Sequence, residues 1–157
     1  QYLRFWFRYV SRLQAFLQVG DIEAVWNRDI EPTIDEFVAR TTWETVCIQH
    51  LWRRVASRSI EPRFQQLGRW WDNQTEIDLV GTWDSRVTLV GECKWTRHPV
   101  GLDVLDGLQR KASKLTLDEQ PLWVLASRSG FDPSVRQRAD QGDLLLIEPD
   151  DLFASVV

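Results

Sequence analysis

The stretch from Glu76 to Trp95, EIDLVGTWDSRVTLVGECKW, decides the fold of this chain. Its two runs EIDLVG and VTLVGECKW are rich in apolar and β-branched residues, and the short segment between them suits a β-hairpin. Side chains alternate between the two faces of a strand, so Glu92 and Lys94 are expected on one face. If the hairpin register brings the polar faces of both strands together, Asp78, Glu92 and Lys94 converge on an otherwise apolar sheet.

Such a cluster predicts a metal site. Two carboxylates and one ammonium group in a half-buried place are unfavourable unless another charge compensates them. A divalent cation held by Asp78 and Glu92 would do so, and Lys94 would then face the substrate. Oxygen ligands suit Mg²⁺ or Mn²⁺. The pattern is typical of a site that cleaves phosphodiester bonds, and Cys93, on the opposite face, is not expected to act as a nucleophile.

The chain resembles a known nuclease superfamily and, more narrowly, one domain family. Asp78, thirteen intervening residues and then Glu92-Cys93-Lys94 resemble the D…(D/E)xK signature of the PD-(D/E)XK nucleases. More narrowly, the chain resembles the domain of unknown function found C-terminal to archaeal-type AAA+ ATPases. Its hallmarks are here the segments LRFWFRYV at 3–10, GRWW at 68–71 before the hairpin, and VGECKW at 90–95.

The resemblance implies a restriction-endonuclease-like α/β fold with an αβββαβ core. In this fold a mixed central sheet is flanked by helices, and this chain would add an extra N-terminal helix. Residues 1–30 would form a helical connector to an ATPase portion of the same polypeptide, and residues 31–157 the nuclease-like domain. The implied function is Mg²⁺- or Mn²⁺-dependent hydrolysis of DNA, which makes the chain a deoxyribonuclease.

The resemblance also implies further site residues. Glu44, from the first core helix, and the backbone carbonyl of Cys93 would complete the oxygen shell of the ion. Gln109 would be a polar residue of a later helix near the metal. From the helical spacing alone, Glu44 lies on or beside the apolar stripe, and it could equally be a boundary residue paired with Arg40 or Arg53.

Periodicity along the chain predicts an alternation of helices and strands. Thr33, with Glu36 three residues later, is predicted to cap the longest helix at its N-terminus. The order agrees with a mixed sheet covered by helices. The predicted helices are 2–19, 34–56, 103–117 and 133–141 with a short one after Pro149, and the predicted strands are 63–71, the hairpin, 121–127 and 143–148.

Net charge is unfavourable for a DNA-binding protein. The chain carries a net charge of −4, and DNA affinity depends on cationic contacts with phosphates. However, eight of the acidic residues lie in residues 118–157, which hold only three arginines. The region 94–114 is locally basic and is predicted to form the nucleic-acid face. The candidates for that face are Arg97, Gln109, Arg110, Lys111 and Lys114.

Other features narrow the function classes. No run of about 18 apolar residues predicts a membrane span, and no GxxxxGK[ST] motif predicts a nucleotide-binding P-loop. The two cysteines form neither a disulfide framework nor a zinc motif, which favours a reducing cytoplasm. A homo-oligomer is compatible with these features. Two alternatives stay open: a catalytically inactive nuclease-fold module that binds nucleic acid or protein and regulates an attached ATPase, and a structural domain whose acids and lysine form an ion-pair network.

Overall fold

The computed structural model describes residues 2–61 and 64–153, which divide into two compact units, Gln1–Trp43 and Glu44–Val157. The sequence predicts a helical connector over 1–30 and a nuclease-like domain over 31–157. Within the described residues, no helix has the length and apolarity needed to cross a lipid bilayer. The candidate site lies in the second unit.

The first unit is helical and has a small aromatic core. Tyr9, Val25, Ile30 and Phe37 are buried together, and the rings of Tyr9 and Phe37 meet edge to face with centroids 5.5 Å apart. The predicted helix 2–19 is present, although a π-helical turn interrupts it. The elements are α1 (Tyr2–Phe5), the π-helix η1 (Trp6–Val10), α2 (Ser11–Gln18), α3 (Ile22–Val25), the π-helix η2 (Trp26–Ile30) and α4 (Glu31–Thr41).

The long helix predicted over 34–56 is two helices. α4 ends at Thr41, and α5 (Trp43–Ala56) follows after Thr42, whose backbone leaves the helical region. The Thr41 hydroxyl donates a 2.5 Å hydrogen bond to the Phe37 carbonyl, a side-chain bond of the kind that disturbs helix geometry. Thr33 is not an N-cap, because α4 begins earlier, with Pro32 in its first turn.

The second unit is built on a five-stranded mixed sheet in the order β1-β2-β3-β4-β5. β1, β2 and β3 are antiparallel neighbours, whereas β3, β4 and β5 are parallel. The predicted mixed α/β sheet flanked by helices is therefore confirmed. Its elements are α5, β1 (Gln66–Trp71), β2 (Glu76–Trp83), β3 (Arg86–Lys94), α6 (Leu102–Ala112), β4 (Leu117–Ser127), α7 (Pro133–Ala139), β5 (Leu144–Ile147) and the 3₁₀ helix η3 (Pro149–Leu152).

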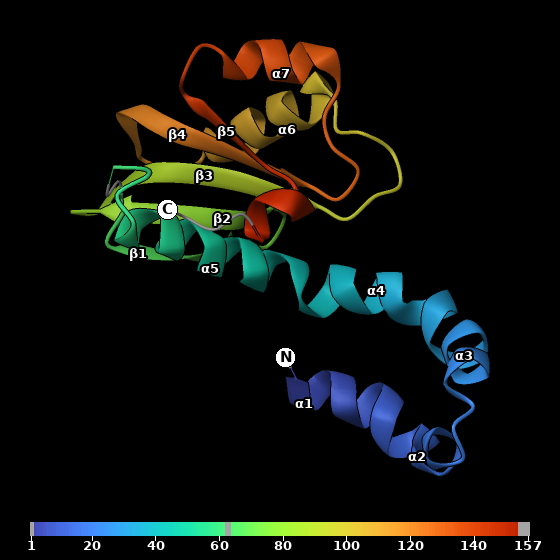
Figure 1. Ribbon diagram of the computed structural model, residues 1–157. Coiled ribbons are helices and arrows are strands. Elements are labelled where there is room, and N and C mark those ends of the chain that lie inside the picture. The colour runs from blue at the N-terminus through green and yellow to red at the C-terminus, as the bar shows by residue number, and fades with distance from the viewer. Residues whose placement is uncertain (1, 62–63, 154–157) are drawn as a thin grey trace. The chain divides into compact units, whose positions relative to one another are not determined.

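Helices cover both faces of this sheet, with α6 and α7 on one side and α5 on the other (Figure 1). On the α6 side, Val90, Trp123 and Leu125 of the central strands pack against Leu105 and Leu108 of α6. On the α5 side, the rings of Trp52 and Phe64 pack edge to face, with their centroids 4.7 Å apart. β4 is parallel to both neighbours, and its segment from Leu122 to Ala126 is a continuous, buried apolar run, as expected of a strand covered on both faces.

A β-bulge in β2 sets the direction of Asp78. Gly68 pairs with Val80 but Trp70 pairs with Ile77, so two residues of β2 lie opposite Arg69 alone. One extra residue reverses the alternation beyond it. Accordingly, Ile77 and Val80 both join the core on the α6 side.

Trp70 and Trp71 diverge as the alternation of β1 predicts. Trp70 packs against the core on the α6 side, whereas Trp71 is 69% exposed. Packing is therefore the role of the first indole, while the second reaches solvent at the end of the edge strand.

Candidate functional site

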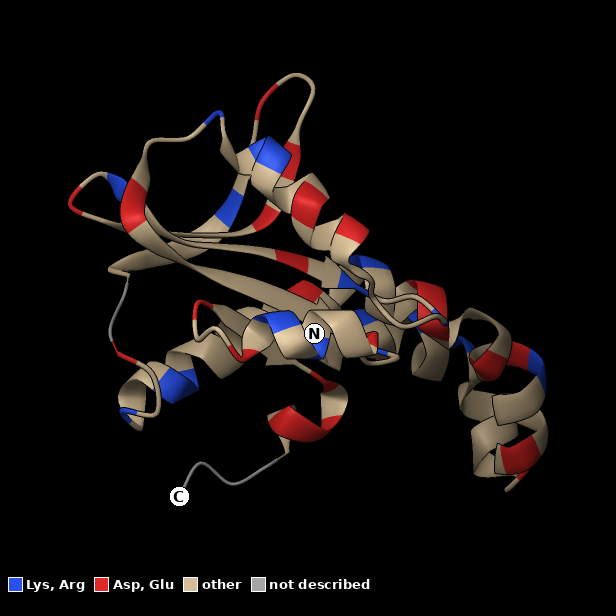
Figure 2. Cartoon of the chain, turned by 90° about the horizontal axis from the view of Figure 1, so that it is seen from above, with Lys and Arg blue, Asp and Glu red and all other residues tan. Residues whose placement is uncertain are grey.

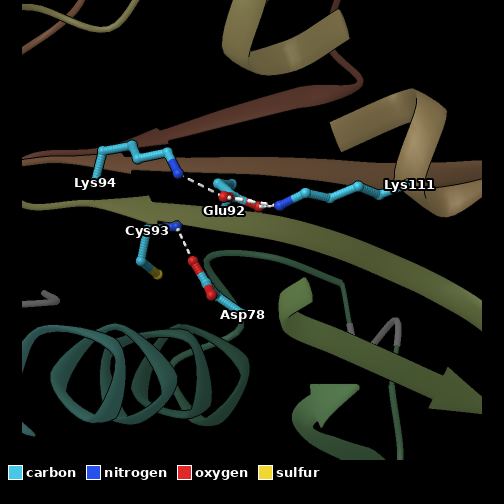
Figure 3. Close-up of polar contacts among 5 residues, drawn as sticks. All are labelled: Asp78, Glu92, Cys93, Lys94 and Lys111. Atoms are coloured by element: carbon cyan, nitrogen blue, oxygen red, sulfur yellow. Dashed lines mark hydrogen bonds and ion pairs between the residues drawn. The ribbon is translucent and has the colours of Figure 1, made fainter. Parts of the chain in front are cut away.

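Glu92 of β3 is a buried carboxylate held by two lysines on the α6 side of the sheet. Its side chain is 7% exposed. Lys94 Nζ lies 2.6 Å from Oε1, and Lys111 Nζ of α6 lies 3.1 Å from Oε1 and 2.9 Å from Oε2 (Figure 3). The predicted pairing of Glu92 and Lys94 on one face is confirmed, because residues two apart on a strand share a face.

Asp78 does not share that face. Its Oδ2 accepts a 2.8 Å hydrogen bond from the backbone N–H of Cys93, and Figure 3 shows its carboxylate on the opposite side of β3 from Glu92. The expectation that three polar side chains meet on one face is therefore wrong for Asp78, and the β2 bulge is the physical reason. Even so, Asp78 bonds the backbone of Cys93, the residue that follows Glu92.

Glu44 belongs to a second polar group on the α5 side. Its Oε2 accepts a 2.6 Å hydrogen bond from Nε of Arg69, and Arg69 also contacts Oε1 of Glu76 at 3.2 Å. Glu44 is thus paired with Arg69 rather than with Arg40, which bonds Glu36. Arg69 lies opposite the β2 bulge, so the same irregularity that turns Asp78 also brings Arg69 to Glu44.

The pKa of Asp78 depends on charges in both polar groups, the one around Glu92 and the one around Glu44. Burial is the main cause that raises the pKa of Asp78 to about 6. The negative charges of Glu92 and Glu44 also raise this pKa, whereas the hydrogen bond from Cys93 and the charge of Lys94 lower it. A carboxylate whose charged form is disfavoured at a cluster of acids is a candidate functional group.

Cys93 points away from Glu92, as predicted. Its thiol faces α5, where a hydrogen bond with Cys47 and burial raise the pKa of the Cys93 thiol well above its ordinary value. A thiol with so little thiolate is a poor nucleophile. The role of this residue in the site therefore rests on its backbone.

The remaining candidates of the predicted nucleic-acid face do not act as one group. Gln109 and Arg110 are exposed on α6, and Arg97 is exposed in the loop after β3. Lys114 donates a 2.9 Å hydrogen bond to Asp72 beyond the end of β1. Figure 2 shows Lys and Arg interspersed with Asp and Glu along the chain.

Two residues make contacts that differ from the sequence-based expectation. No role is predicted for Arg69, which binds Glu44. Lys111 is predicted on the nucleic-acid face, but its ammonium group contacts Glu92. A signal for Lys111 was present, because it follows Leu108 by three residues and Val104 by seven. These spacings put it on the core-facing stripe of α6.

No ready-made cluster of acids for a metal is found among residues 2–61 and 64–153. No three His, Cys, Asp or Glu side chains there form a group that could hold an ion. Any cation at this place would depend on Asp78, Glu92 and backbone oxygen, with Glu44 held away by Arg69.

A family model matches most of the chain. Residues 6–113 match the model of DUF234, described as archaeal and bacterial proteins of unknown function. This match covers all of the polar residues described above except Lys114, which follows it directly. A search of curated proteins gives no match.

Two solved structures match part of the chain. One is a protein of unknown function, AF1548, with 16% identity and a TM-score of 0.40, covering 68% of this chain and 57% of that one. The other is protein VC1899 from Vibrio cholerae, with 20% identity and a TM-score of 0.42, covering 71% of this chain and 30% of that one. The chain therefore spans little more than half of the first of these proteins and less than a third of the second.

Proposed function

The chain belongs to the DUF234 family, whose function is unknown, and from its site we propose that it hydrolyses phosphodiester bonds of DNA in a reaction that depends on Mg²⁺ or Mn²⁺. The proposal includes the finer fold assignment, a restriction-endonuclease-like core of the PD-(D/E)XK type. The order α5-β1-β2-β3-α6-β4 supports this assignment, since it is the αβββαβ order expected from the sequence.

The observation that carries the proposal is the 2.8 Å hydrogen bond from the backbone N–H of Cys93 to the Asp78 carboxylate. Cys93 lies between Glu92 and Lys94, so this bond brings Asp78 beside the strand segment that carries both. Burial, and to a lesser extent the negative charges of Glu92 and Glu44, raise the pKa of Asp78 to about 6. A purely structural ion-pair network would normally give each buried carboxylate a cationic partner.

The chemistry of the donor set fits a hard divalent cation. Asp78 and Glu92 supply carboxylate oxygens, and the carbonyl of Cys93 supplies a neutral one. The Lys94 carbonyl accepts a hydrogen bond from the backbone N–H of Arg128, directly after β4. Because successive strand residues turn their backbone groups to opposite edges, Cys93 turns its own toward β2 and Asp78. When bound, the ion would polarise a phosphoryl oxygen and lower the pKa of a water molecule.

The chain's own residues would then orient a water molecule and neutralise negative charge on the phosphate. Lys94, 36% exposed at the end of β3, would position a water molecule or balance the charge that develops on the phosphate. Glu92 would hold the Lys94 ammonium group in place beside the scissile bond. Glu44, bound to Arg69, would act on Asp78 only through its charge.

DNA is the proposed substrate class, with help from a partner. Arg97 and Arg110 are exposed cations near the carboxyl end of β3 and on α6, yet the net charge of −4 opposes binding to a polyanion. We therefore include in the proposal an ATPase portion of the same polypeptide that holds the nucleic acid against this domain.

One observation favours a second candidate function. Both oxygens of Glu92 are already bound by lysines, and Asp78 lies on the other side of β3. A site whose carboxylate is already occupied by lysines would suit a catalytically inactive nuclease-fold module that binds DNA or protein and regulates an ATPase.

Two measurements separate the candidates. Thermal unfolding in a Mn²⁺ titration should show a rising midpoint if the native state binds the ion, and plasmid, branched and single-stranded DNA should be nicked with Mn²⁺ present. Asp78→Ala and Glu92→Ala should abolish both effects, whereas the matched exposed change Glu76→Gln should preserve them. Nicking that persists in the two alanine variants comes from a contaminant and overturns the proposal. DNA binding with neither a Mn²⁺ effect nor cleavage supports the inactive module.

A further inference from the structure

Lys111 is the one residue of the described chain shown to contact both oxygens of Glu92. It comes from the last turn of α6 and reaches across to β3. Lys94, two residues along the same strand, contacts Oε1 alone. The two ammonium groups therefore cover the Glu92 carboxylate differently, and Oε2 is bound by Lys111 (Figure 3).

The two lysines bring two positive charges to Glu92, whose single negative charge requires only one. Glu92 is 7% exposed, so its charge requires a partner. Lys94 already supplies one, at the shorter distance of 2.6 Å. Lys111 supplies a second, and its side chain is 35% exposed on a long flexible stem. Lys111 can therefore withdraw into water with a small loss, which a fully buried lysine could not do.

A divalent cation on Glu92 and the Lys111 ammonium group would compete for the same carboxylate. An ion held by Glu92 would use at least one of its two oxygens, and both oxygens are in contact with Lys111. Two positive groups on one carboxylate also repel each other at a few ångströms. Occupation by the ion would therefore weaken the contact between Lys111 and Glu92.

We propose that Lys111 is a positioning residue that acts through Glu92, holding the carboxylate in its buried place and giving it up to a divalent cation. This inference rests on the proposed metal-dependent function. It assigns to Lys111 a competition with the ion in place of the DNA contact expected from the sequence. Because coupling between two sites is reciprocal, removing Lys111 must change the affinity for the ion.

The test is Mn²⁺ binding by the whole chain, measured by titration calorimetry without DNA. Lys111→Met should tighten the apparent Kd about tenfold, within the usual range of coupling between sites. Without the ion and with a chelator present, the same variant should melt at a lower temperature, and Mn²⁺ should raise its melting temperature by more than that of the wild type. Lys111→Arg, which keeps the charge, should restore an affinity near that of the wild type.

Lys114→Met is the matched control. It removes the same charge three residues away, from a lysine that bonds Asp72, and should leave the Mn²⁺ affinity within about twofold. Equal affinities of Lys111→Met and the wild type, or weaker binding by the variant, overturn the inference while the metal site stands. Absence of Mn²⁺ binding in both proteins overturns the proposed function and this inference together.

Discussion

The backbone N–H of Cys93 donates a hydrogen bond to the carboxylate of Asp78, fifteen residues earlier in the chain. The bond forms just beyond Leu79 and Gly91, the last pair of the β2–β3 ladder at this end. A side-chain oxygen thus continues the ladder where a backbone carbonyl would stand in a longer hairpin. The hydrogen bond thus joins Asp78 to Cys93, the residue between Glu92 and Lys94.

Asp78→Asn should change stability in a way that depends on pH. The pKa of Asp78 is about 6 in the folded chain and about 3.9 in unfolded peptides, so the folded state binds the proton more tightly. The favourable contribution of Asp78 is thus complete below about pH 4 and is lost as pH rises to 6. Relative to the wild type, the neutral variant should gain roughly 1–2 kcal/mol between pH 4 and pH 8. Urea unfolding at both pH values measures this gain, and a difference that does not vary with pH would contradict it.

Glu92→Gln should destabilise the domain. The substitution leaves the ammonium groups of Lys94 and Lys111 facing a neutral amide, and we expect a loss of about 1–3 kcal/mol, because both lysines are partly exposed and can turn to water. Glu76→Gln changes an exposed acid that contacts Arg69 at 3.2 Å, and should cost less than about 0.5 kcal/mol. Chemical denaturation at low salt compares the two variants. Equal losses would mean that the lysines do not stabilise Glu92.

Gly91→Ala should weaken the sheet beside the site. An added Cβ would lie 2.9 Å from the Leu79 side chain and 3.0 Å from the backbone oxygen of Val124, which cannot move aside. We expect a loss of about 1–3 kcal/mol from this overpacking. Gly107→Ala in α6 meets only the far end of Arg110 at 3.8 Å and should stabilise by about 0.5–1 kcal/mol through helix propensity. Thermal melts should show a lower melting temperature for Gly91→Ala and a higher one for Gly107→Ala. An unchanged melting temperature of Gly91→Ala would refute the close packing.

The two thiols should react slowly in the folded protein. Cys47 is fully buried, and its hydrogen bond with Cys93 raises the pKa of the Cys93 thiol. Iodoacetamide should therefore alkylate native protein at least about tenfold more slowly than protein unfolded in urea at the same pH. Mass spectrometry of timed samples follows the reaction. Rapid modification of Cys93 alone would show that this thiol is accessible and would reopen a direct chemical role for it.

Local patterns were sufficient for the order of elements and for part of the site. The alternation of strand side chains is a local property, so VGECKW alone predicted that Glu92 and Lys94 share a face and that Cys93 points away. The apolar runs near residues 123 and 145 likewise predicted the strands that became β4 and β5. The end of a helix at Thr41 was missed, because a side-chain hydrogen bond to Phe37 competes there with helix propensity.

The sequence by itself determined the mixed α/β sheet, the β2–β3 hairpin and the pairing of Glu92 with Lys94, because each follows from periodicity within a few residues. Only the tertiary structure decided the face of Asp78, the partner of Glu44 and the contacts of Lys111. A one-residue bulge depends on how β2 pairs with β1, and the reach of α6 to β3 depends on packing across the sheet. Helical spacing puts Lys111 on the core-facing stripe of α6, but it does not identify Glu92 as the partner, and no local spacing predicts the bulge.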